Sequence, residues 1–123
     1  MLNDSRLIAF VATTDAAKAK AFYGGKLGLE LVSEDRFAVV FNANGTTLRV
    51  AIAGEFVPAR FTVLGWEVRD IEQKARELQS AGIVPERYPG IEQDELGIWH
   101  APGGAKVAWF KDPDGNILSI SQH

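Results

Sequence analysis

Cysteine is absent from the sequence, and methionine occurs only once. Without cysteine the chain has no disulfide, no thiolate metal site and no cysteine nucleophile. Histidine is also scarce, with one residue inside the chain, His100, and one at its end, His123. Ligand binding or catalysis must therefore use side chains other than cysteine. The absence of thiols is typical of the reducing cytoplasm, which is the compartment we expect.

A strong charge of either sign is missing as well. The 13 basic and 16 acidic residues give a net charge of -3 and are interspersed along the chain. No basic stripe is available to neutralise a phosphate backbone, so nucleic acid is not expected as a partner. No apolar run approaches the roughly 20 residues of a membrane span, and residues 1–6 lack the features of a signal peptide. A membrane partner is therefore not expected either.

What is present is typical of one folded domain, which we expect to cover residues 1–123. Hydrophobic residues make up 46% of the chain and charged residues 24%. The apolar run at residues 7–12 indicates a strand buried on both faces, and Asp15 is a helix-capping residue. Gly24-Gly25 is expected to end the helix that follows. Three residues share the apolar face of this helix: Ala19, Phe22 and Tyr23.

The rest of the first half reads as further strands, which completes the order β-α-β-β-β. An extended segment follows the helix, and strands are expected at residues 37–41 and 47–52, joined by the turn Asn42–Gly45. Residues 55–60 then interrupt the pattern. We interpret this segment as the connector between two modules.

The same order returns after the connector. A strand at residues 63–68 precedes a helix whose start resembles a capping box, formed by Asp70 and Gln73. Strands at residues 106–110 and 116–121 flank the turn Asp112–Gly115. The apolar stripe of the helix contains Ile71, Ala75 and Leu78.

The two halves can be compared residue by residue. Residues 42–50 overlay residues 112–120 without a gap, which places Leu48 on Leu118. We therefore predict an α+β fold of two tandem β-α-β-β-β modules, about 5–54 and 61–122, that form one curved eight-stranded mixed sheet. The second module carries an insertion, roughly residues 88–104, which is a candidate pocket wall or lid.

These features resemble the vicinal oxygen chelate superfamily, which includes glyoxalase, bleomycin-resistance and extradiol-dioxygenase proteins. The resemblance covers nearly the whole chain. It implies that eight strands form a cup around a small-molecule ligand, arranged either through a homodimer, which we expect, or within one chain. The motifs that carry it, in order, are Asp15, Ala21-Phe22-Tyr23, Leu27-Gly28-Leu29, Gly65-Trp66-Glu67-Val68, Asp70 and Phe110–Asn116.

Enzymes of this family generally bind a divalent metal through the first and fourth strands of each module. The resemblance places the first-strand ligand seven residues before the capping aspartate, at Ile8 and Val63. It places the last-strand ligand seven residues after the first aspartate of the turn, at Ser119, and at Arg49 by the internal overlay. Aliphatic side chains offer no lone pair and a guanidinium repels a cation. We therefore predict no metal site and no cofactor.

Strand alternation places Arg49 and Ser119 on the cup side, together with Phe10 and Glu67. A guanidinium in that position needs a carboxylate or an anionic ligand to offset its desolvation. Three interpretations stay open: an ion pair between Arg49 and Glu67, exposure at an edge, or an anionic ligand. Glu67 is also the one candidate for a catalytic residue, as a general base made more basic by burial.

The insertion adds Trp99 and His100, with Asp94 and Glu95 close by in the sequence. This set would supply metal-ligand types, but an exposed loop histidine beside a packing tryptophan explains the same pattern. Trp66 has the helix-facing parity and is assigned to the core. Trp99 is the better candidate for the pocket.

The predicted function is metal-free binding, in which the protein sequesters or senses a small organic molecule. One alternative is a glyoxalase-like lyase, isomerase or dioxygenase whose metal site is unusual or is completed by a dimer partner. Another is an accessory module whose cup is filled by side chains. The predicted ligand-binding residues are Phe10, Arg49, Glu67, Trp99, His100 and Ser119.

Overall fold

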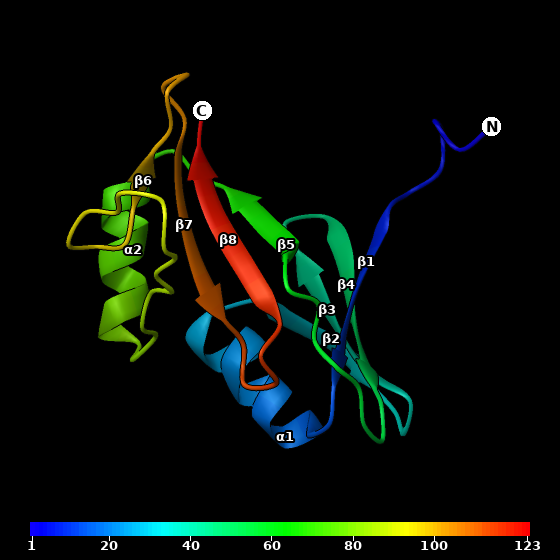
Figure 1. The fold of residues 1–123 in the computed structure, drawn as a ribbon. Helices are drawn as coiled ribbons and strands as arrows, with labels where there is room; N and C mark the ends of the chain where they lie inside the picture. Colours follow the sequence, from blue (N-terminus) through cyan, green and yellow to red (C-terminus); the bar gives the residue numbers. More distant parts are fainter. The chain divides into compact units, whose positions relative to one another are not determined.

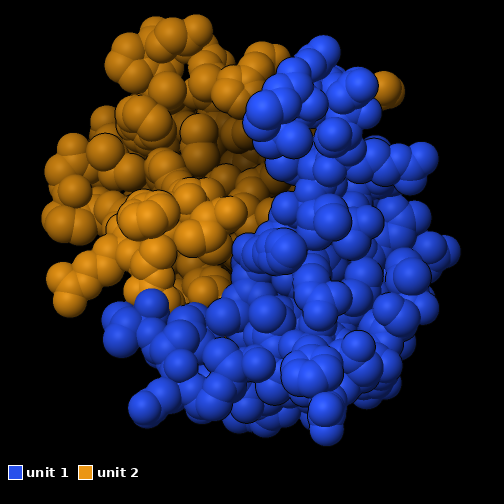
Figure 2. Space-filling view, turned by 90° about the vertical axis from the view of Figure 1, so that its right-hand side faces the viewer, with its two compact units in different colours: residues 1–57 blue, residues 58–123 orange.

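The computed structural model describes all of residues 1–123. The chain forms two compact units, residues 1–57 and residues 58–123 (Figure 2). Each unit contains one helical region and one four-stranded mixed sheet, and each follows the order β-α-β-β-β (Figure 1). The α+β fold of two tandem β-α-β-β-β modules is thus confirmed, whereas the predicted single eight-stranded sheet is instead two sheets of four strands, because hydrogen bonding joins only strands of the same unit. No helix of the chain is both long and apolar enough to cross a membrane.

In unit 1 the first and last strands are neighbours. The strand order is β1-β4-β3-β2, with β1 parallel to β4 and the other pairs antiparallel. The elements are β1 (Ile8–Thr13), α1 (Ala16–Ala19), η1 (Lys20–Lys26), β2 (Glu30–Glu34), β3 (Ala38–Ala43) and β4 (Thr46–Ile52).

The helical region of unit 1 begins as predicted and ends later. Asp15 caps it by accepting a hydrogen bond from the Lys18 backbone N–H at 3.1 Å. The prediction that Gly24-Gly25 ends the helix is wrong, because a π-helical turn continues through Lys26. A Cβ on Gly24 would lie 3.3 Å from Phe41 Cε1, so this glycine allows close packing against β3. The predicted apolar face is confirmed, since Ala19, Phe22 and Tyr23 are all buried.

Strand β1 has one buried face and one exposed face, so the prediction of burial on both faces is wrong. Val11 is buried, and its partner in the sheet is Val50 of β4. Ile8 and Phe10 point the other way, and 52% and 55% of their surfaces are exposed. The helical region of unit 1 is on one side of the sheet only, so alternate residues of the apolar run lack a covering layer.

The hairpin of β3 and β4 turns through only two residues. Asn44 and Gly45 both have positive φ, 51° and 93°, which is the backbone of a type I′ turn. The Asn42 side-chain carbonyl accepts a hydrogen bond from the Gly45 backbone N–H at 2.8 Å. The turn predicted at Asn42–Gly45 is confirmed, with β3 extending to Ala43 and β4 starting at Thr46.

Unit 2 repeats this topology. Its strand order is β5-β8-β7-β6, again with the first and last strands parallel and adjacent. Helix α2 packs against β7 and β8. Asp70 caps α2 by accepting a hydrogen bond from the Gln73 backbone N–H, as predicted. The elements are β5 (Thr62–Glu67), α2 (Ile71–Ser80), β6 (Trp99–His100), β7 (Lys106–Lys111) and β8 (Ile117–Gln122).

The two hairpins differ by one residue, which corrects the ungapped overlay. Phe41 pairs with Leu48, seven positions later, whereas Phe110 pairs with Leu118, eight positions later. The equivalence of Leu48 and Leu118 holds, and both side chains are buried. The extra residue lies in the second turn, where the buried Asp112 carboxylate accepts hydrogen bonds from the Asp114 and Asn116 backbone N–H groups. This side chain supports a longer turn than two residues.

Candidate functional site

In each unit the helical region covers one face of the sheet, and we call the opposite face the helix-free face. In unit 1 the register aligns Phe10, Arg49 and Val40 as neighbours across three strands. Arg49 and Val40 are half-buried, and Phe10 is exposed. The predicted site residues Phe10 and Arg49 therefore lie side by side on this face.

The Arg49 side chain forms no hydrogen bond or ion pair within unit 1, and its charge acts electrostatically on Asp35. The Asp35 carboxylate accepts hydrogen bonds from the backbone N–H groups of Phe37, at 2.7 Å, and Ala38, at 3.0 Å. These two bonds lower the pKa of Asp35, and the positive charge of Arg49 adds a smaller effect in the same direction. Because Asp35 and Arg49 are joined by no hydrogen bond or ion pair, the Arg49 guanidinium keeps its hydrogen-bonding capacity for another group.

The helix-free face of unit 2 has a different composition. One row across its strands contains Gly65, Ser119 and Trp109. The next row contains Glu67, Ser121, Val107 and Trp99. Trp66 lies on the opposite side, beside Ile120, as its parity indicated.

An aromatic cluster occupies one side of this face. The rings of Trp99 and Trp109 are stacked, with centroids 6.1 Å apart and planes tilted by 29°. Tyr88 meets the Trp109 ring edge-on, at 5.4 Å between centroids and an interplanar angle of 85°. Sequence reasoning placed Trp99 here but did not identify Tyr88 or Trp109. The alternation of β7 was the available signal for Trp109, since it shares the parity of Val107.

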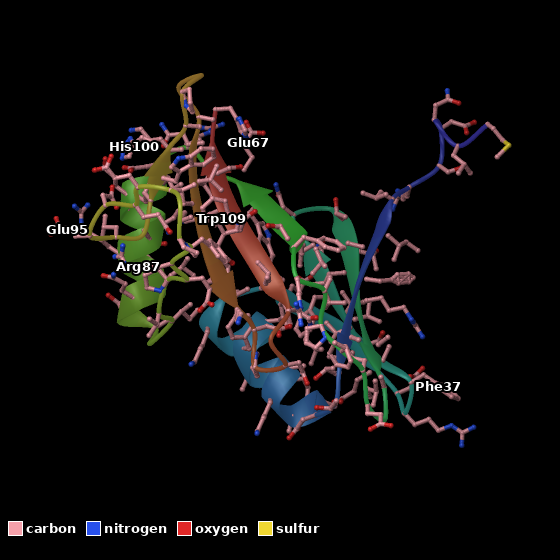
Figure 3. All side chains as sticks on the ribbon, in the orientation of Figure 1. Phe37, Glu67, Arg87, Glu95, His100 and Trp109 are labelled. Atoms are coloured by element: carbon pink, nitrogen blue, oxygen red, sulfur yellow. The ribbon has the colours of Figure 1, made fainter.

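Two predicted residues lie at one end of the unit 2 sheet, where β5 and β6 meet solvent (Figure 3). Glu67, at the end of β5, is exposed. The burial on which the general-base hypothesis depended is therefore not present. His100 is exposed too, and its Nε2 lies 3.2 Å from an Asp94 carboxylate oxygen. His100 is thus an exposed residue whose acidic neighbour, Asp94, lies in the preceding loop.

Asp94 is held mainly as a turn residue. Its Oδ1 accepts hydrogen bonds from the backbone N–H groups of Leu96, at 3.0 Å, and Ile98, at 2.9 Å. Burial alone would raise the pKa of Asp94, but these bonds and the contact with His100 outweigh it and lower the pKa. The Glu95 backbone carbonyl accepts a hydrogen bond from the Arg87 side chain, and the Glu95 side chain lies on the outer loop (Figure 3). Nowhere in the chain do three His, Cys, Asp or Glu residues gather as a metal site would require.

The residues at the four family metal positions do not fit a divalent cation. Ile8 and Val63 are exposed aliphatic residues without a donor atom, and Val63 falls where the pairing of β5 with β8 is irregular. Arg49 carries a positive charge, and Ser119 offers only a neutral hydroxyl. Divalent cations in proteins are bound by carboxylate, imidazole, thiolate or carbonyl groups, and none of these side chains supplies one.

Unit 2 also has a small pocket on the other side of its sheet. It lies between α2 and strands β7 and β8, and its walls include Ala75, Leu78, Ile83 and Ile120. This lining is almost entirely apolar. The pocket is therefore part of the packing of the helix on the sheet, and Trp109 also contributes to its lining.

A duplicated β-α-β-β-β module with the first and last strands parallel defines a recognised class of α+β protein. The chain belongs to the glyoxalase/bleomycin resistance protein/dioxygenase superfamily, whose family model matches residues 7–120. The resemblance inferred from the sequence motifs is thereby confirmed. A comparison with curated proteins finds no match in sequence.

Solved structures agree with this assignment. The chain is similar to the glyoxalase family protein from Enterococcus faecalis, with 22% identity, coverage of 98% of this chain and 99% of that one, and a TM-score of 0.75. It is also similar to lactoylglutathione lyase from Agrobacterium tumefaciens, with 18% identity, coverage of 98% and 95%, and a TM-score of 0.75. TioX from Micromonospora sp. ML1 matches with 16% identity, coverage of 97% and 98%, and a TM-score of 0.71. At these identities the likeness establishes the fold alone.

Proposed function

We propose that the protein sequesters or senses a small organic ligand, and that it does so without the divalent metal used by enzymes of its superfamily. The observation that supports this proposal is the position of Arg49. Its guanidinium stands at one of the four positions where enzymes of the family hold metal, half-buried beside Phe10 and Val40 and without an ion pair in unit 1. A positive charge in this place repels a divalent cation and attracts an anion.

Each helix-free face would supply contacts of its own. On unit 1, Arg49 would bind a carboxylate or phosphate group and Phe10 would supply apolar contact; on unit 2, Trp99 would supply apolar contact. The hydroxyl of Ser119 and the exposed polar groups of Glu67 and His100 would provide hydrogen bonds. A ligand of this kind is a small anionic molecule with an apolar or aromatic body.

The experiment compares thermal stability in the presence of 2-naphthoate, which is anionic, and 2-naphthamide, which is not. A ligand that binds the folded protein raises its apparent stability as it saturates the site. We expect 2-naphthoate to raise the Tm of the wild-type protein more than 2-naphthamide does. Arg49→Met should abolish that difference because it removes the charge and keeps the length of the side chain.

Arg36→Met is the matched control. Arg36 is an exposed arginine of the same unit, and its guanidinium lies 4.8 Å from the centre of the Phe37 ring. This variant should keep the full preference for 2-naphthoate. Equal responses of the Arg49→Met and wild-type proteins would refute the assigned role of Arg49. A stoichiometric divalent metal in the purified protein, whose chelation abolishes an activity, would refute metal-free binding as a whole.

The alternative of an enzyme with an unusual metal site is favoured by one observation. Asp94 and His100 are both metal-ligand types, and their side chains lie 3.2 Å apart. Two ligands leave at least one position of a metal site to be supplied by a partner. Titration with Zn²⁺ and Mn²⁺ tests this alternative: a rise in Tm that His100→Ala removes would support it against the leading proposal.

We also propose that the protein is a cytoplasmic homodimer. The lack of cysteine supports the compartment. Exposed apolar side chains of β1 and its flank, among them Leu7, Ile8 and Phe10, support association with a second copy. Light scattering during size-exclusion chromatography tests this directly, because a homodimer has twice the mass of 13.4 kDa.

A further inference from the structure

The insertion of unit 2 brings a tyrosine against the tryptophan pair of the helix-free face. Tyr88 lies edge-on to Trp109, which is stacked with Trp99. The register places Trp109 in the same row as Ser119, and Trp99 in the row of Val107 and Ser121. The three aromatic rings therefore belong to one continuous surface beside two serine hydroxyls.

The Tyr88 hydroxyl has no hydrogen-bond partner although it is buried. A buried polar group without a partner is costly to the folded state, and such groups are rare in native proteins. Burial of the ring, reinforced by the negative charge of Glu86 and opposed by Lys111, raises the pKa of Tyr88. The hydroxyl is thus protonated at neutral pH and is available as a donor to an acceptor that the chain itself does not supply.

The backbone around Tyr88 is fixed by one side chain, that of Gln93. Its Oε1 accepts a hydrogen bond from the Tyr88 backbone N–H at 2.8 Å. Its Nε2 donates to the backbone carbonyl groups of Glu86, at 2.9 Å, and Gly97, at 2.8 Å. The Glu86 backbone N–H in turn donates to the Trp109 carbonyl at 2.8 Å. The unpartnered hydroxyl is therefore held in place by a network.

Next to the aromatic cluster, Gly65 leaves the surface of the sheet without a protruding side chain. A Cβ on Gly65 would lie 2.6 Å from the Ser119 Oγ, so the serine side chain leans over the glycine. Ser119 and Gly65 are neighbours of Trp109 across the sheet. A flat molecule stacked on Trp109 would meet a hydroxyl there and not a bulky side chain.

We propose that Tyr88, Trp99 and Trp109 bind a planar aromatic molecule that carries a hydrogen-bond acceptor, and that the Tyr88 hydroxyl recognises the acceptor. The inference rests on the proposed small-molecule binding and specifies the ligand class on the unit 2 face. Access to the hydroxyl requires one ring to shift. We expect the Trp99 ring to be the one that shifts, because β6 is only two residues long and is joined to the rest of the sheet by its pairing with β7 and one bridge to Gln93.

Quinoline and naphthalene are the probes, because they have the same shape and only quinoline has an acceptor nitrogen. Binding is followed through the indole N–H signals of the three tryptophans in ¹H–¹⁵N NMR spectra. We expect both probes to shift the signals of Trp99 and Trp109, while Trp66, on the other side of the sheet, is the internal control. Quinoline should bind about fivefold more tightly than naphthalene, as one added hydrogen bond allows.

Tyr88→Phe is the decisive variant. It should reduce the preference for quinoline to about one, and it should raise the Tm of the free protein by about 3 °C because it removes a buried hydroxyl without a partner. A purely structural tyrosine would give no change in preference. Tyr23→Phe, which alters the other tyrosine of the chain, is the matched control and should keep the preference for quinoline.

Two results would overturn the inference: an unchanged preference in Tyr88→Phe, or the absence of any shift of Trp99 and Trp109 up to the solubility limit of quinoline. These results are separable from failure of the proposed function. If 2-naphthoate still stabilises the protein through Arg49, only the aromatic site of unit 2 is refuted. If 2-naphthoate fails too, both proposals are refuted.

Discussion

Unit 1 presents an arginine between aliphatic and phenyl groups on its helix-free face, whereas unit 2 presents two tryptophans, a tyrosine and serine hydroxyls. The helix-facing rows of the same strands have stayed alike, with Leu48 matched by Leu118 and Val50 by Ile120, all buried. A duplicated strand thus carries two kinds of constraint on alternate residues. Packing against a helix fixes one face, and the other face is free to acquire different binding chemistry.

The largest expected effect is on the free energy of unfolding, at a buried leucine that both units have. Leu48→Ala and Leu118→Ala should each lower the free energy of unfolding by about 3 kcal/mol, because each opens a cavity in an equivalent buried row. Chemical denaturation measures both. Leu2→Ala, at an exposed leucine, should change stability by less than about 0.5 kcal/mol. A loss at only one of the two core positions would show that the cores are not equivalent.

The next effect is on stability and concerns the insertion at residues 88–104, which only unit 2 has. Gly97 has a φ of +83°, and a Cβ there would lie 2.5 Å from Pro85 Cβ. Gly97→Ala should therefore cost about 2 to 3 kcal/mol through backbone strain and steric overlap. Gly104→Ala, with a φ of +95° but open space around it, should cost only about 1 kcal/mol. Equal losses in thermal denaturation would remove the packing argument.

The third prediction contrasts the two hairpin turns. Asp112→Ala should cost about 2 kcal/mol, because the buried carboxylate accepts bonds from Asp114 and Asn116 and leaves these donors unpaired when removed. Asn42→Ala should cost about 0.5 kcal/mol, since the hydrogen bonds of its side chain with Gly45 and Glu30 are both exposed. Denaturant unfolding of the two variants gives the comparison. Similar values would mean that the longer turn does not depend on its aspartate.

The smallest effect is one of pH. The pKa of Asp94 is lowered from 3.8 in the folded state, so its contribution is present at higher pH and lost as the pH falls below about 4. Asp94→Asn should cost roughly 0.5 kcal/mol at pH 7, a value reduced by solvent exposure, and less at pH 3. Stability measured against pH for both proteins tests the sign. A gap that widens at low pH would contradict it.

Local signals in the sequence predicted the elements that depend on local interactions. Asp15 and Asp70 were identified as helix caps, and both accept the backbone hydrogen bond that defines a cap. The turn at Asn44-Gly45 follows from two residues that tolerate positive φ. These features involve residues within a few positions of one another, so a short stretch of sequence contains the cause and its effect.

The errors arose where the cause lies elsewhere in the chain. Gly24 was interpreted as a helix stop, but it lies inside the helical region, where the absence of a side chain leaves room for Phe41 of β3. The exposure of Ile8 and Phe10 depends on which side of the sheet the helical region covers, which an apolar run alone does not show. Tyr88 was missed because its ring contacts Trp109, which lies on a distant strand. Its backbone is held by Gln93, whose side chain forms hydrogen bonds with three separate backbone groups.

For the candidate site, the sequence predicted adjacency within one face but not its chemistry. Phe10 and Arg49 were predicted on the cup side and are direct neighbours in the register. The burial expected for Glu67 is absent, because that residue ends its strand in solvent. Parity along a strand is therefore a reliable guide to the side of a sheet, while exposure depends on where the strand ends.

The strand order β1-β4-β3-β2, repeated as β5-β8-β7-β6, has a consequence for synthesis on the ribosome. In each unit the strand made last is an inner strand, and it is the only partner of the strand made first. The nascent β1, with Ile8 and Phe10, therefore stays unpaired until Ile52 has been translated and has left the exit tunnel. During that interval an apolar segment with a free edge is exposed to chaperones and to other nascent chains. Deleting residues 117–122 would likewise leave β5 without any partner, so in each unit the sheet is complete only when its last strand has been made.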